Sequence, residues 1–419
     1  MFNFKKIFFV FFSIPCLTFA QQRLQIEECY QKAQDNYPLI KRTALLQKTL
    51  DYNVSNASKG WLPQFSINAQ ASYQSDVTQL PFSIPGYEVD PLSKDQYKAT
   101  VELNQTIYDG GAIAAQKQLA KKQSAVEIQK NEVDLDKLKE RINQIYFGIL
   151  MAESQLKQSE LTKTDLLNTL KKVESQLKNG VVFRSNVDQI KAQLVSIEQR
   201  QIEIKSMRKS YLDMLSAFLN QKLDDNTQLE KTQVLSLSAD NNDKSLKLLD
   251  LQSEALQAQI GMINAKNRPK LGVFAQGGYG KPGFNMLKNE FDTFYIAGAK
   301  LSIPLSGFYT RKNEISTVAI QRTDLSVQRE TYLFNSNLQT TQNNNELLKY
   351  QALLAKDDEL VNLRQNITQS TYAQLQNGVA NSADYIRETN AAEQARLQKD
   401  LHEIQFLLTQ YNQKVHLGN

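Results

Sequence analysis

Two very long segments of this sequence contain almost nothing that would interrupt an α-helix. Residues 112–178 include no proline and one glycine, and residues 308–376 include neither. Proline removes a backbone donor and glycine weakens a helix interior, so each segment is predicted to form long continuous helix. At a rise of about 1.5 Å per residue, each would be about 100 Å long. The length of 419 residues alone would suggest two or three ordinary domains, whereas these segments predict long regular elements.

Both long segments end at the same dipeptide, Asn179-Gly180 in the first and Asn377-Gly378 in the second. Glycine at positive φ is a common helix terminator. Return helices are predicted at about 185–220 and 382–416. Apolar residues at alternating spacings of three and four recur along the helices, which indicates antiparallel coiled-coil packing.

Each long helix is preceded by a pair of alternating segments. "PQFSINAQASYQ" at 63–74 and "PKLGVFAQGGYG" at 269–280 lie 206 positions apart and share Pro, Ala, Gln and Tyr at matching places. Second alternating segments follow at 97–104 and 294–303, after loops rich in turn residues. Alternation with period two predicts strands, so the sequence contains two β-hairpins. An opening helix is predicted before each hairpin, at about 24–58 and 243–266.

The landmarks divide the chain into two repeats. Gly110 lies 69 residues before Asn179, and Gly307 lies 70 residues before Asn377. A fixed order at a fixed period indicates internal duplication. The first repeat is predicted over 21–220, with its hairpin at 63–104 and its tip near 179–186. A polar linker follows at 221–242. The second repeat is predicted over 243–419, with its hairpin at 269–303 and its tip near 377–384.

Residues 1–20 have the pattern of a secretory signal peptide. Lys5 and Lys6 precede an apolar core, and Thr18-Phe19-Ala20 is an acceptable cleavage site. The alternative is a lipoprotein signal with lipidation at Cys16. No later run of 18 apolar residues exists, so no membrane-spanning helix is expected, and entry into a membrane would require β-strands. Cys29 remains as a single thiol and is expected to be buried.

The composition argues against nucleic-acid binding and against enzymatic chemistry. The formal charge is +5, of which the signal contributes two, and the remainder is dispersed. The chain has two histidines, His402 and His416, with no metal-ligand cluster, phosphate loop or nucleophile motif. We interpret these histidines as helix-surface residues and the acids at 224–225 and 357–358 as solvated. No catalytic, cofactor or metal site is predicted.

The strands have the length and alternation of a transmembrane barrel. Aromatic residues at both ends of the strands are typical of the two membrane interfaces. They are Trp61, Tyr108, Phe308 and Tyr309 at one end, and Tyr73, Tyr97, Tyr279 and Tyr295 nearer the other. Four strands cannot close a barrel, and open edges in lipid would leave backbone groups unpaired, so two, three or four copies are expected to share one barrel. The long helices would then form a second tube on one side of the membrane.

These features together resemble the TolC-like outer-membrane efflux channels along residues 24–417. The resemblance rests on the two repeats and on four segments in this order: "LNQTIYDGG" (103–111), "NGVVFRSNVDQIKAQL" (179–194), "LSIPLSGF" (301–308) and "NGVANSADYIRETNAA" (377–392). It implies a mainly α fold with a small transmembrane β part, a homotrimer with a shared 12-stranded barrel on a periplasmic α-helical barrel, and docking of a periplasmic adaptor from an inner-membrane pump at the helix tips.

The resemblance also implies functional residues at the tips. In the family's founding member, acidic residues lie six and nine positions after the second tip glycine and close the periplasmic aperture. Asp384 matches the first position, Arg387 departs from the second, and the first repeat has Asn186 at the sixth position. The alternative role for Asp384 is that of a helix-capping acid, and Arg387 could pair with it. The expected adaptor-docking residues are Gly180, Val181, Val182, Gly378, Val379, Ala380 and Ser382.

Two functions remain in view from the sequence. The first is a passive exit duct in the outer membrane, with a long periplasmic portion, for a tripartite efflux pump or type I secretion system. The alternative is a periplasmic coiled-coil adaptor or scaffold without a pore. The four alternating strands favour the duct, which would contact outer-membrane lipids. The sequence names neither the cargo nor the pump class, nor a receptor role for loop 75–96.

Overall fold

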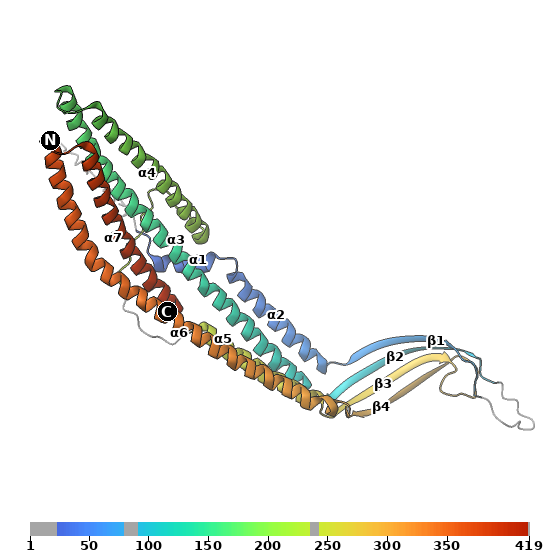
Figure 1. The fold of residues 1–419 in the computed structure, drawn as a ribbon. Coiled ribbons are helices and arrows are strands. Elements are labelled where there is room, and N and C mark those ends of the chain that lie inside the picture. Colours follow the sequence, from blue (N-terminus) through green and yellow to red (C-terminus); the bar gives the residue numbers. More distant parts are fainter. Residues whose placement is uncertain (1–22, 79–90, 235–242, 418–419) are drawn as a thin grey trace, which may run out of the picture.

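The structure, a computed structural model, describes residues 23–78, 91–234 and 243–417. The molecule is long and gently curved, with the helices forming most of its length and a sheet at one end (Figure 1). In these ranges no helix is both long and apolar enough to cross a bilayer. The predictions for the signal peptide at 1–20, including Cys16, fall outside the described residues, as do those for residues 79–90 of the first hairpin loop and 235–242 of the linker.

The two long helices form as the sequence predicts. They are α3 (Ala112–Lys178) and α6 (Gly307–Gln376), and the return helices are α4 (Arg184–Leu219) and α7 (Ser382–His416). The opening helix of the second repeat, α5 (Lys244–Lys266), begins where the Asp243 carboxylate accepts from the Ser245 amide at 2.8 Å. Each long helix packs on its return helix toward the tip and on an opening helix toward the sheet (Figure 1).

The single opening helix predicted at 24–58 is wrong, because the chain forms two helices there. They are α1 (Ile26–Asn36) and α2 (Ile40–Ser58). Pro38 lies between them, and Tyr37 before it is extended, with ψ of 130°. A residue that precedes proline is disfavoured in the helical region, so the break is set locally. A short 3-10 turn, η1 (Lys59–Trp61), leads from α2 into the sheet.

The sheet has four antiparallel strands in the order β1-β2-β3-β4. Their bounds are Gln64–Tyr73, Asp95–Tyr108, Lys270–Lys281 and Asp292–Ser302. The two predicted hairpins are β1–β2 and β3–β4, and β2 also pairs with β3, so the sheet joins the two repeats. In one row of the register Ala69 lies opposite Ala99, and Ala99 lies opposite Tyr279.

The register gives the sheet two chemically different faces. One, the apolar face, carries Phe65, Ile67, Ala69, Tyr97, Val101, Leu103, Ala275, Tyr279, Tyr295 and Ala297. The opposite face, the polar face, carries Ser66, Asn68, Gln70, Lys98, Thr100, Glu102 and Gln276, together with Phe274, Phe294 and Ile296. Residues paired across antiparallel strands share a face, so this division extends across all four strands.

The main core lies midway along the molecule, where α1, α3, α4 and α7 meet. Ile26, Ile142 and Phe147 are among its fully buried side chains. Cys29 is buried here as expected, and burial raises the pKa of its thiol to about 12. The Tyr146 hydroxyl lies 2.8 Å from the Leu24 carbonyl and 2.7 Å from the Glu230 carbonyl. It therefore connects α3 to the segment before α1 and to the linker.

Several buried positions along the coiled coils are polar. The apolar stripe of α3 pauses between Ala152 and Leu166, and Ser159 and Thr162 fill the gap at 1% and 4% exposure. Gln201 of α4 donates to the Ser159 hydroxyl at 3.0 Å. The interpretation of residue 357 as solvated is wrong, because Asp357 is buried and lies 2.7 Å from Nδ1 of His402. A pair of this kind across α6 and α7 is not visible in a linear pattern of charges.

Candidate functional site at the helix tips

The two tips have the same backbone geometry. At the end of α3, Gly180 has a φ of +70°, its amide donates to Leu177, and the Val181 amide donates to the Gln176 carbonyl at 2.9 Å. At the end of α6, Gly378 has a φ of +72°, and the Val379 amide donates to the Gln374 carbonyl at 2.9 Å. This six-to-one bond beside a left-handed glycine is the Schellman motif, which satisfies carbonyls at a helix end.

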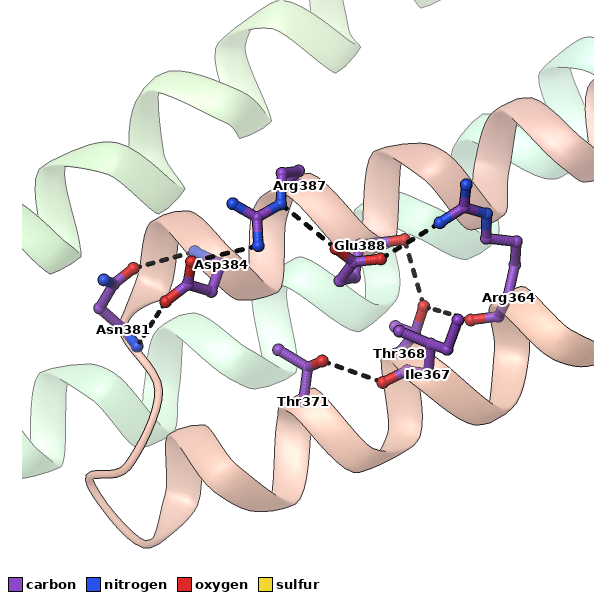
Figure 2. Close-up of polar contacts among 8 residues, drawn as sticks. All are labelled: Arg364, Ile367, Thr368, Thr371, Asn381, Asp384, Arg387 and Glu388. Carbon is purple, nitrogen blue, oxygen red and sulfur yellow. Dashed lines mark hydrogen bonds and ion pairs between the residues drawn. The ribbon is translucent and has the colours of Figure 1, made fainter.

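The second tip is reinforced where α7 begins. The Asn381 side chain accepts from the Asp384 amide at 2.9 Å, and the Asp384 carboxylate accepts from the Asn381 amide at 3.4 Å (Figure 2). This reciprocal pair is a capping box, in which two otherwise unpaired helix donors are satisfied. The capping role considered for Asp384 is therefore present in the structure.

A chain of charges continues from Asp384 along α7 and across to α6. Arg387 lies 3.3 Å from the Asp384 carboxylate and 3.2 Å from that of Glu388. Glu388 in turn lies 3.5 Å from Arg364 of α6, and Thr368 of α6 donates to the Glu388 carbonyl at 3.2 Å (Figure 2). The pairing of Arg387 with Asp384 was anticipated, whereas the roles of Glu388 and Arg364 were not. Charges of alternating sign thus connect the two helices of this tip.

The first tip lacks the capping box. The residue that precedes α4 is Phe183, whose side chain offers no cap, and its ring is 81% exposed. Asn186 is half-buried, and its amide donates to the Phe183 carbonyl at 3.1 Å. Arg184 and Asp188 of α4 lie 3.8 Å apart, and Lys191 of α4 lies 3.0 Å from Glu174 of α3, so one ion pair also joins the two helices of this tip. Phe183 was not among the predicted docking residues, although an aromatic residue inside a predicted tip turn is itself a signal of a contact surface.

The expected docking residues differ in accessibility. Val181 and Val379 are 60% and 77% exposed, and both tip glycines are exposed. Val182 and Ala380 are half-buried, and Val182 packs on the tip core around Ile190 and Leu375. Ser382 is fully buried, so in this chain it offers no surface to a partner.

A cavity of about 590 Å³ lies above the tips between α3, α6 and α7. Its lining is polar and includes Lys172, Tyr372, Glu393 and Arg396. Glu393 is 6% exposed, and burial raises the pKa of its carboxyl, while Arg200 at 3.4 Å acts in the opposite direction. The cavity therefore contains an acid that its surroundings bias toward the neutral form.

The eight aromatic residues expected at the membrane interfaces are all exposed in the single chain. Trp61 and Tyr108 lie where the sheet meets the helices, and Phe308 and Tyr309 open α6 at the same level. Tyr73, Tyr97, Tyr279 and Tyr295 lie in the half of each strand away from the helices. Tyr97, Tyr279 and Tyr295 share the apolar face.

Long coiled-coil pairs that end in glycine tips, joined to a four-stranded sheet with one apolar face, are the architecture of an outer-membrane efflux channel. In sequence, the profile of the outer membrane efflux protein family matches residues 29–221. The resemblance to TolC-like channels is therefore confirmed, and such channels lie in the bacterial outer membrane with their helices in the periplasm. No curated protein sequence matches the chain.

The fold matches solved channel structures across nearly the whole chain. One is CusC, with a TM-score of 0.70 and 13% sequence identity over 94% of this chain and 92% of that one. Another is VceC of Vibrio cholerae, with a TM-score of 0.68, 15% identity and coverage of 94% and 96%. A third is the outer-membrane channel MtrE of Neisseria gonorrhoeae, with a TM-score of 0.68, 12% identity and coverage of 94% and 89%.

Proposed function

We propose that this chain is one third of a homotrimeric exit duct in the outer membrane. It conducts substrates passively from a pump and its adaptor, across the periplasm and out of the cell. The observation that carries this proposal is the junction of about 100 Å of paired helices with one sheet that is apolar on one face and polar on the other. A wall of this kind separates lipid from water.

The free edges of the sheet support a barrel shared between copies, and the resemblance to TolC-like channels supports three copies. Strands β1 and β4 each have one side unpaired in the single chain. Unpaired strand edges are costly in lipid, and three copies would close them into 12 strands. Because β1 and β4 run antiparallel to each other within the ordered sheet, β4 of one copy continues into β1 of the next without a change in strand alternation.

The tips supply the periplasmic end of the proposed duct. Three copies of Asp384 would surround the axis and favour cations, and each would be partly neutralised by its own Arg387 at 3.3 Å. The exposed residues Val181, Phe183 and Val379 would contact the adaptor, since exposed apolar groups on a turn are typical of binding surfaces. Adaptor binding would shift the tips from a closed to an open state.

The alternative of a poreless periplasmic scaffold finds no support in the fold. A scaffold has no need for a sheet with an apolar outer face, and such a protein would leave the membrane fraction in salt. The pump class and cargo stay open within the proposal, because selection in such an assembly lies with the pump rather than with the duct.

The experiment that tests the proposal is site-specific photo-crosslinking in intact cells. Val379 is the position of choice because it is 77% exposed, and Tyr52 on α2, 69% exposed and distant from the tips, is the matched control. We expect capture of a periplasmic adaptor from Val379 and none from Tyr52. Capture of no adaptor at Val379 during active efflux, or full release of the protein from membranes by salt, would favour the scaffold.

A further inference from the structure

The polar face of the sheet carries an aromatic cluster near its outer end that lipid contact does not explain. Phe294 of β4 lies on this face in the row of Thr100 and Gly278. Its ring occupies the space above Gly278, where an added Cβ would lie 2.5 Å from the ring. Phe294 is only 8% exposed although it lies on the edge strand. A large apolar side chain is thus held among polar neighbours.

The loop between β3 and β4 covers this ring with a second one. Phe284 packs on Phe294 with ring centroids 4.5 Å apart, and Phe284 itself remains 54% exposed. The ammonium of Lys98 lies 5.0 Å from the Phe294 centroid and 6.0 Å from that of Phe284. An exposed ring and an exposed ammonium therefore lie side by side on the polar face.

Lys98 forms no salt bridge with any acid in the part of the chain that the structure describes. Among the described residues, no carboxylate lies within 4.0 Å of its ammonium. Two acids of the strands share this face: Glu102 accepts from Gln276 at 2.7 Å, and Asp292, two strands away, accepts from the Thr293 amide at 2.8 Å. The ring faces stabilise the cation without consuming its hydrogen-bond donors.

The loop has anchors that do not involve Phe284. Asn289 accepts from the Ser93 amide at 3.0 Å and from its hydroxyl at 2.9 Å. Phe291 stacks on Tyr279 at 5.4 Å and on Tyr97 at 6.2 Å, both on the apolar face. Anchoring the loop therefore does not require an aromatic residue at position 284.

We propose that Lys98, Phe284 and Phe294 form a binding site for organic anions in the outer mouth of the duct. The ammonium binds the anionic group of a passing solute, and the exposed Phe284 ring packs against its apolar part. This inference rests on the proposed function, because only a closed barrel turns the polar face into a lumen wall. Three copies of the site would then surround the exit.

The test is block of single channels in a planar bilayer by naphthalene-2-sulfonate added from the side of the loop. We expect block by this anion and none by methanesulfonate or by a naphthalene that bears a trimethylammonium group. Lys98→Met and Phe284→Ala should each raise the blocking concentration about fivefold or more. Lys300→Met, at the opposite end of the same face, and Leu287→Ala, which shortens an exposed apolar side chain of the same loop, are the matched controls.

The outcomes separate the two proposals. Channels that open normally but are not blocked, or are blocked equally in all four variants, would overturn the anion site and leave the duct intact. A protein that forms no channels at all would overturn both, because no lumen would exist for the polar face to line.

Discussion

The guanidinium of Arg387 lies 3.3 Å from the carboxylate of Asp384, one turn earlier on the same helix. The same carboxylate closes the capping box with Asn381. Asp384, the acid proposed for the aperture, is thus held by two interactions, one with the Asn381 backbone amide and one with the Arg387 guanidinium. At the proposed aperture that cation would weaken the field of Asp384, which distinguishes this tip from one with two acids.

Asp384→Ala is expected to lower the cation preference of the open channel, because three carboxylates would leave the axis. The same change removes half of a capping box, which costs about 1 kcal/mol locally. Arg387→Gln should act in the opposite direction and raise cation preference. The measurement is the reversal potential in a KCl gradient, with Asp188→Ala in the first tip as control. Unchanged selectivity in Asp384→Ala would remove this residue from the aperture.

Asn143→Ala is expected to destabilise the region where α1, α3 and α7 meet. Asn143 is fully buried, donates to Asn412 at 2.8 Å and accepts from the Tyr30 hydroxyl, so it connects α1, α3 and α7. Its removal leaves two partly buried polar groups without this partner, at a cost of up to about 1–3 kcal/mol each. Thermal unfolding in detergent measures the loss, and Asn412→Ala in the same background tests whether the two changes are coupled. Fully additive losses would show that the two residues act independently.

Glu393→Gln is expected to change how stability depends on pH. Burial raises the pKa of this carboxyl above its ordinary value of 4.5, so the folded chain holds a proton that the unfolded chain has lost. Stability should therefore fall as pH rises from about 4.5 through the raised pKa, and the variant should lack that part of the fall. Melting temperatures between pH 4 and 8 provide the measurement. Glu198→Gln, at an exposed pair with Lys163, is the control.

Gly110→Ala and Gly180→Ala form a matched pair with φ of +71° and +70°. Both substitutions carry the left-handed cost of about 1 kcal/mol. At Gly110 a Cβ would also lie 2.7 Å from the Cβ of Arg268, whereas at Gly180 nothing lies within 4 Å. Gly110→Ala should therefore reduce the melting temperature and the yield of assembled protein more than Gly180→Ala. Equal losses would mean that the junction between strand and helix tolerates displacement of Arg268.

The sequence was sufficient for the elements whose determinants are local. The absence of proline over 112–178 predicts α3, and glycine at 180 and 378 predicts the ends of both long helices. Pro38 could have predicted the break between α1 and α2, because its effect on Tyr37 is also local. That break was missed because the apolar pattern continued on both sides of it.

The features that the sequence did not predict depend on contacts between distant segments. The pairing of β2 with β3 joins residues more than 160 positions apart, and no local pattern specifies it. The Asp357–His402 pair and the chain from Arg387 to Arg364 each require the register of α6 against α7. The roles of Phe183 and Phe284 are likewise visible only once the surroundings of their rings are known.

The pairing of β2 with β3 also changes what assembly requires. Two separate hairpins per chain would give a trimer six junctions to close, each with a register of its own to find. Because the four strands of one chain already form a single sheet, the proposed trimer would need only three identical pairings of β4 with β1 to complete the ring. Before such an assembly forms, the sheet of each chain has two unpaired edge strands, β1 and β4. An unassembled subunit would therefore expose two strand edges that can pair with other chains, so in the proposed trimer assembly itself would protect against aggregation.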